Sequence, residues 1–121
     1  MKKQILSVLL IAGLAGVFLG CQVPKSMQQV KWKDKPTKLD QSLAHYEEGL
    51  RLEADGQRQK AIEQYEASVQ ISPRPVVYYR LGLLYADDQK YDKAAENYKL
   101  ALALNPNYTE AKKELDALPV K

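Results

Sequence analysis

Apolar residues recur at helical spacing in two adjacent stretches in the second half of the chain. The first, over about residues 76–87, is apolar on nearly every side, and such a helix must be covered on several sides. The polar tripeptide Asp88-Gln89-Lys90 follows it. The second stretch, over about residues 91–104, ends at Asn105-Pro106, because proline lacks an N–H and disfavours helix in the residue before it. It carries one apolar stripe, formed by Ala94, Tyr98, Ala101 and Leu102. The pattern predicts a hairpin of two helices.

The same pattern occurs once more upstream. Gly49 precedes Gly82 and Pro73 precedes Pro106, in both cases by 33 residues. The same offset relates Ala61 to Ala94, Tyr65 to Tyr98 and Ser68 to Ala101. A repeat of this period is the signature of a stacked helical solenoid.

Residues 75–108 resemble the tetratricopeptide repeat. The resemblance lies in an aromatic residue, a Leu-Gly pair, small residues in the second helix and a final proline: Tyr78, Leu81, Gly82, Tyr85, Ala94, Tyr98, Ala101 and Pro106. Residues 42–74 are a weaker copy, which keeps Gly49, Ala61, Tyr65 and Pro73 but has His45, Glu48 and Leu52 in place of Tyr78, Leu81 and Tyr85. The resemblance implies an all-α domain of two helix-turn-helix repeats in a right-handed α-solenoid.

Flanking helices complete this domain, which we expect over residues 40–118. The first repeat should begin with a helix over residues 40–54, with Asp40 or Ser42 as its N-cap, and return over residues 57–71. A last helix over residues 109–118, with Thr109 as its cap, has a polar outer side. That side is what a terminal capping helix of a repeat stack needs.

The N-terminal 20 residues have the pattern of a signal peptide. Lys2 and Lys3 precede an apolar run that is shorter than the ~20 residues needed to span a bilayer. The run ends at Gly20-Cys21, which resembles a bacterial lipobox, although Phe18 and Leu19 depart from its usual residues. The resemblance implies cleavage before Cys21 and its lipidation. The alternatives are a free thiol or an uncleaved anchor. In the same resemblance, Gln22 implies the outer membrane of a bacterium with two membranes.

Residues 21–39 contain few apolar side chains and two prolines, and we interpret them as a tether. Residues 22–38 carry a net charge of +4, whereas residues 39–121 carry −3. The lysines of the tether either lie on anionic headgroups with Trp32 at the interface, or only solvate a linker while Trp32 packs on the first helix. The whole-chain charge of +3 gives no argument for a nucleic-acid partner.

Catalytic motifs are missing from the sequence. His45 is the single histidine, and it falls where the repeat places a packing residue. There is no metal-ligand spacing, no phosphate-binding glycine loop and no nucleophile motif. We therefore expect a protein that is not an enzyme and that needs no metal or cofactor.

A binding surface is the better candidate for function, because the leading helices of tetratricopeptide repeats line a concave groove. By register, the groove positions are Leu43, Tyr46, Leu50, Glu53, Val76, Tyr79, Leu83, Ala86 and Asp87. An extended segment or an amphipathic helix of a partner would suit this apolar and aromatic surface. Two alternatives stay open. Tyr46 and Tyr79 pack against each other between the repeats, or a second copy closes the groove, since about three repeats are usually needed for a stable stack.

Together these patterns suggest a lipid-anchored adaptor that holds another cell-envelope protein, facing the periplasm. It is similar in architecture to the repeat lipoproteins that assist the assembly of pilus and secretion machines. The alternative is a self-associating scaffold or spacer with no separate peptide ligand.

Overall fold

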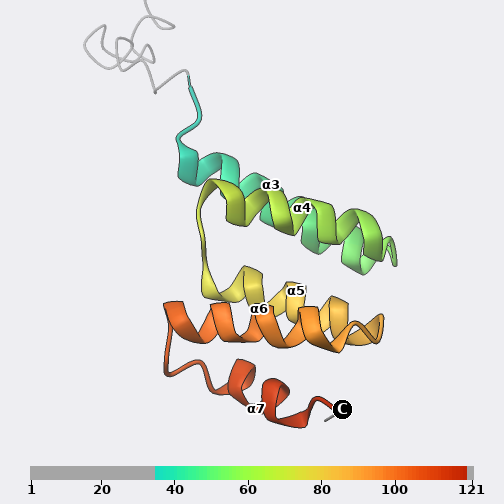
Figure 1. Cartoon of the computed structure of the whole chain (residues 1–121). Coiled ribbons are helices and arrows are strands. Elements are labelled where there is room, and N and C mark those ends of the chain that lie inside the picture. The colour runs from blue at the N-terminus through green and yellow to red at the C-terminus, as the bar shows by residue number, and fades with distance from the viewer. Residues whose placement is uncertain (1–34, 120–121) are drawn as a thin grey trace, which may run out of the picture. The chain divides into compact units, whose positions relative to one another are not determined.

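Five α-helices account for most of residues 35–119, the part of the chain that the computed structural model describes (Figure 1). They are α3 (Lys38–Ala54), α4 (Arg58–Ile71), α5 (Pro75–Asp87), α6 (Tyr91–Leu104) and α7 (Thr109–Ala117). The helices pack in pairs, α3 with α4 and α5 with α6, while α7 packs on α6. The prediction of an all-α stack of helical hairpins is confirmed. The predicted signal peptide, Cys21 and the tether up to residue 34 lie outside the described residues.

Most helix bounds follow the predicted periodicity, but the predicted caps were wrong. Helix α3 begins at Lys38, and its N-cap is Thr37 rather than Asp40 or Ser42. The Thr37 hydroxyl accepts from the Asp40 N–H at 3.1 Å, and the Asp40 carboxylate accepts from the Thr37 N–H at 2.8 Å. This capping box satisfies two backbone donors at the helix start, which explains why the helix begins earlier than expected.

At the last helix, Tyr108 is the N-cap and Thr109 is the first helical residue, so the prediction of a Thr109 cap was wrong. The Thr109 hydroxyl instead donates to Glu110 Oε2 at 3.1 Å. The helix ends at Ala117, one residue before the predicted end. Helix α5 begins with Pro75 at its first position, where the missing N–H costs no hydrogen bond.

The turns of the two hairpins are equivalent. Helix α3 ends at Ala54 and α4 begins at Arg58, and α5 ends and α6 begins 33 residues later. A residue with positive φ lies between the paired helices in each, Gly56 at 76° and Gln89 at 61°. The next N–H reaches back into the preceding helix, from Gln57 to the Leu52 carbonyl and from Lys90 to the Tyr85 carbonyl, both at 2.9 Å. These bonds satisfy carbonyls at the helix end that would otherwise lack partners.

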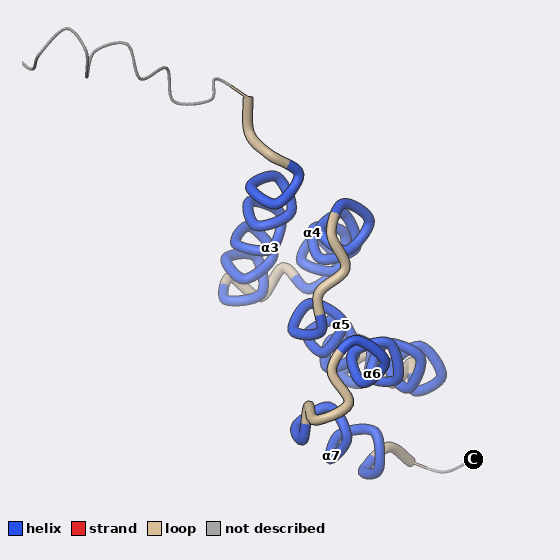
Figure 2. Tube along the Cα trace, turned by 90° about the vertical axis from the view of Figure 1, so that its left-hand side faces the viewer, coloured by secondary structure: helices blue, strands red, loops and turns tan. Residues whose placement is uncertain are grey.

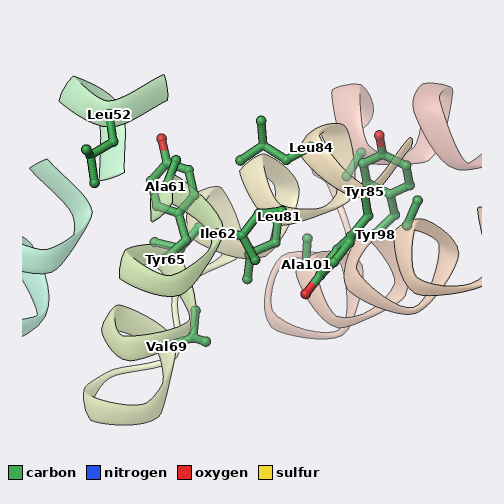
Figure 3. Packing of buried hydrophobic residues seen from close by; sticks show 13 residues of the cluster. Leu52, Ala61, Ile62, Tyr65, Val69, Leu81, Leu84, Tyr85, Tyr98 and Ala101 are labelled. Atoms are coloured by element: carbon green, nitrogen blue, oxygen red, sulfur yellow. The ribbon is translucent and has the colours of Figure 1, made fainter. Parts of the chain in front are cut away.

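Close helix crossings are set by glycine and tyrosine. A Cβ placed on Gly49 would lie 2.4 Å from Cε1 of Tyr65, and one placed on Gly82 would lie 2.4 Å from Cε1 of Tyr98. Both tyrosine rings are fully buried in the hydrophobic cluster shown in Figure 3. The ring of each return helix therefore occupies the space that a side chain on the leading helix would need.

Polar bonds join one hairpin to the next. Arg58 at the start of α4 contacts Asp88 after α5 at 2.8 Å, and Arg80 of α5 contacts Glu53 of α3 at 3.2 Å. Seen along the helices, α3 and α5 lie on the left of their partners α4 and α6 (Figure 2).

No helix among the described residues is long and apolar enough to cross a membrane.

Candidate functional site

The surface of the leading helices α3 and α5 carries the nine predicted groove positions. We call this surface the leading-helix face. Asp87 is exposed and the other eight residues are partly exposed, so each remains in contact with solvent. Several of them also pack against the core on their inner side: Tyr46, Leu50, Val76, Tyr79, Leu83 and Ala86.

The tyrosines of this face pack within their own hairpins. The ring of Tyr46 lies 5.9 Å from that of Tyr65, and the ring of Tyr79 lies 6.1 Å from that of Tyr98. Tyr79 also contacts Tyr108, at 5.2 Å between ring centroids. The alternative in which Tyr46 and Tyr79 pack mainly against each other is therefore not the arrangement found.

Glu53 is engaged by residues of the chain itself. Its carboxylate accepts from the Tyr65 hydroxyl at 2.6 Å and from Arg80 at 3.2 Å. Burial, and then the bond to Glu53, raise the pKa of the Tyr65 hydroxyl. Glu53 is one of the predicted groove residues, but its carboxylate forms a bridge between the two hairpins.

Tyr98 occupies the same place in the second hairpin but has no such partner. Its hydroxyl is buried and makes no hydrogen bond. The residue 33 positions after Glu53 is Ala86, which offers no acceptor. Burial raises the pKa of Tyr98, and the charges of Glu114 and Asp87 contribute to the shift in the same direction.

Sequence reasoning missed the contribution of the last hairpin connection and of α7. Tyr108 packs against Tyr79 with a tilted ring, and Glu110 and Glu114 lie four residues apart on α7, which places them on one helix face. Burial raises the pKa of Tyr79, and the charges of Glu114 and Glu110 raise it further. The only signal in the sequence was Tyr108, an aromatic residue directly before the predicted start of the last helix. Such a residue does not by itself indicate a contact with Tyr79.

Arg74 is a second residue that the sequence did not single out. Its guanidinium lies over the ring of Tyr46, 5.0 Å from the centroid, in a cation–π contact. Two of its nitrogens, Nε and Nη2, are buried without a hydrogen-bond partner. Arg74 lies in the connection between the hairpins, so this contact holds the Tyr46 ring against that connection.

His45 bridges the first pair of helices. Its Nδ1 lies 2.8 Å from Gln64 Oε1, and its side chain is partly buried. This is the packing role that its register position predicts. Within residues 35–119, no group of three or more His, Cys, Asp or Glu side chains is placed to hold a metal ion.

A cleft of about 560 Å³ lies on another part of the surface. Residues of α4, α5 and α6 line it, among them Glu66, Gln70, Tyr78, Lys93 and Leu100. It includes none of the nine residues of the leading-helix face.

Comparison with protein families gives one match. Residues 75–108 match the tetratricopeptide repeat, over the same residues as the second hairpin and its connection to α7. No curated protein matches the chain. The chain therefore contains a tetratricopeptide repeat within an all-α stack of paired helices, a repeat that is generally non-catalytic and indicates a role in protein–protein interaction.

Proposed function

We propose that this protein is a lipid-anchored adaptor of the bacterial cell envelope, which holds another envelope protein on its leading-helix face. The observation that carries the proposal is the composition of that face. Leu43, Leu50, Val76 and Leu83 are partly exposed apolar side chains, and Tyr46 and Tyr79 lie between them. An apolar and aromatic surface on repeat helices is suited to an extended segment or an amphipathic helix of a partner.

Anchoring is proposed from the sequence before the described residues. A positively charged start, an apolar run of signal-peptide length and Gly20-Cys21 support cleavage and lipidation at Cys21. Acyl chains contribute about 0.8 kcal/mol per buried methylene, so more than one chain gives stable attachment. Gln22 supports the outer membrane, with the domain facing the periplasm. In this location the protein would assist the assembly of a pilus or secretion complex.

The anchoring part is tested by Cys21→Ser. We expect the variant to keep its full-length mass or to leave the membrane fraction, measured by mass spectrometry and fractionation. A variant with the same mass and the same membrane fractionation as the wild-type protein would refute lipidation.

The adaptor part is tested with a photo-crosslinking amino acid at Tyr79 in intact cells. The matched control places it at Glu63, an exposed residue of α4. A single foreign envelope protein captured from position 79 and not from position 63 supports the adaptor. Crosslinks from position 79 to other copies of the chain alone would overturn it in favour of a self-associating scaffold.

A further inference from the structure

The two core tyrosines lie in the same geometry, so they can be compared directly. In each hairpin the ring passes over the leading-helix glycine, with the nearest approach of a Cβ at 2.4 Å. Each ring also has a leading-helix tyrosine beside it, at 5.9 Å in the first hairpin and 6.1 Å in the second. The interplanar angles are 39° and 42°. By this equivalence, the Tyr98 hydroxyl corresponds to that of Tyr65, and Ala86 corresponds to its partner Glu53.

What surrounds the two hydroxyls differs. Around Tyr65, the carboxylate of Glu53 and the guanidinium of Arg80 complete a chain of polar bonds. Around Tyr98, Ala86 replaces the carboxylate and the hydroxyl has no partner. A buried hydroxyl without a partner is costly, and native proteins keep few of them.

The charges near Tyr98 are mainly negative. The carboxylates of Glu114 and Asp87 act on its hydroxyl, and those of Glu110 and Glu114 act on the neighbouring Tyr79. Arg80 also lies within electrostatic range of Tyr79, but its charge is paired with Glu53. The residue 33 positions after Arg80 is Lys113, which is exposed to solvent. Tyr65 has the ion pair of Glu53 and Arg80 beside it, whereas Tyr98 has carboxylates nearby and a hydroxyl without a partner.

The ring of Tyr79 lies beside that of Tyr98 and also contacts the ring of Tyr108. Tyr79 and Tyr108 lie 5.2 Å apart with their planes tilted by 49°. Aromatic faces attract cations, with lysine and arginine side chains as the usual partners in proteins. A basic side chain would therefore meet ring faces, carboxylates and a hydroxyl that can accept a hydrogen bond.

We propose that Tyr79, Tyr98 and Tyr108, with Glu110 and Glu114, form a subsite for a lysine or arginine side chain of the partner bound on the leading-helix face. We call these five residues the aromatic–acidic cluster. The cationic group donates to the Tyr98 hydroxyl and pairs with the α7 carboxylates. The Tyr98 hydroxyl is buried, whereas Tyr79 and Glu114 are partly exposed, so the proposal requires these two side chains to move aside when the ligand binds. This subsite rests on the proposed function, because it specifies one contact of that partner.

The test uses the full chain in detergent and a phage-displayed library of short random peptides as the probe. Selected peptides are synthesised, and their affinities are measured by fluorescence anisotropy against variants. We expect the peptides to share a lysine or arginine, and its replacement by glutamine to weaken binding about tenfold. Glu110→Gln with Glu114→Gln should cause a similar loss, and combining protein and peptide changes should add little further loss. Tyr98→Phe, which removes the hydroxyl and no charge, should weaken binding several-fold.

Two controls separate this inference from the proposed function. Glu63→Gln with Glu96→Gln removes the same charge from the return helices α4 and α6 and should leave peptide affinity unchanged. Leu50→Ala with Leu83→Ala removes apolar contacts of the leading-helix face outside the cluster and should weaken every peptide. Peptides that depend on Leu50 and Leu83 but lack a basic residue, or bind the Gln variants equally well, would overturn the subsite and leave the adaptor function standing. If no selected peptide depends on Leu50 and Leu83, both are overturned.

Discussion

The two hairpins share one backbone design but hold their helices together with different chemistry. Both have a glycine beneath a buried tyrosine, and both turn at a residue with positive φ. In the first, Ser42 and Ser68 exchange hydrogen bonds at the buried crossing, with Ser68 Oγ donating to the Ser42 carbonyl at 2.8 Å and Ser42 Oγ to the Ser68 carbonyl at 3.0 Å. The first hairpin is thus joined by polar bonds.

In the second hairpin the equivalent residues are Pro75 and Ala101, and neither side chain can make such bonds. Its leading helix instead buries four apolar side chains, Val77, Leu81, Leu84 and Tyr85. The comparison shows that the small residue and the ring opposite it set the crossing, while the polar bonds around it are replaceable. The Tyr98 hydroxyl has no partner because Ala86 stands where Glu53 stands in the first hairpin.

The largest effect should come from raising the pH, which tests what the hairpins share. Burial, with a hydrogen bond to Glu66, raises the pKa of Tyr85 to about 12, and burial also raises the pKa values of Tyr65 and Tyr98. The folded protein then keeps these protons at a pH where the unfolded chain loses them. The stabilisation from Tyr85 is complete below pH about 10 and is lost as the pH rises through about 12, and the contributions of Tyr65 and Tyr98 begin to fall above pH about 10 as well. Circular dichroism during urea unfolding should show this loss, and Tyr85→Phe should reduce it; equal stability at both ends of the window would contradict the assignment.

A leucine at either glycine should cause the next largest loss. Gly82→Leu and Gly49→Leu place side-chain atoms where the rings of Tyr98 and Tyr65 lie, and these rings are fully buried and have no free space to enter. We expect each change to lower the free energy of unfolding by more than about 3 kcal/mol. Thermal unfolding measures it. Gly56→Ala is the control, because no atom lies near a Cβ there and only the positive φ is strained. An unchanged melting curve for Gly82→Leu would refute the register.

Removing one hydroxyl from each hairpin tests the difference between them. Tyr65→Phe removes a hydrogen bond to a carboxylate and should cost about 1.5–3 kcal/mol. Tyr98→Phe removes a buried hydroxyl that has no partner and should change stability by less than about 0.5 kcal/mol, or raise it. Equal losses from urea unfolding of the two variants would mean that Tyr98 has a partner in solution.

The smallest effect concerns the turns. Gln89 adopts a positive φ of 61°, which costs a residue with a side chain about 1 kcal/mol or slightly more, whereas glycine adopts it freely. Gln89→Gly should therefore raise stability by about 1 kcal/mol, and Gly56→Gln should lower it by a similar amount. Opposite shifts in the denaturant midpoint are expected. Shifts of the same sign would show that the two turns are not equivalent.

Helix positions, turns and the repeat were predictable because they depend on nearby residues. Periodicity located α6 at its observed bounds, and the prolines separated the hairpins correctly. The start of α3 was missed because Thr37 and Asp40 compete with later capping residues, and only their mutual hydrogen bonds decide between them. The nine leading-helix positions were placed by register alone, yet that register did not reveal that Glu53 is bonded to Arg80.

By itself, the sequence determined the all-α character of residues 35–119, with a tetratricopeptide repeat at residues 75–108 and a similar hairpin before it. Only the tertiary structure decided that Glu53 joins Tyr65 to Arg80, that Tyr108 packs against Tyr79 and that the Tyr98 hydroxyl has no partner. The physical reason is distance along the chain. Helix periodicity is encoded within a few residues, whereas these contacts join residues from different helices and depend on the direction of each side chain after the helices have packed.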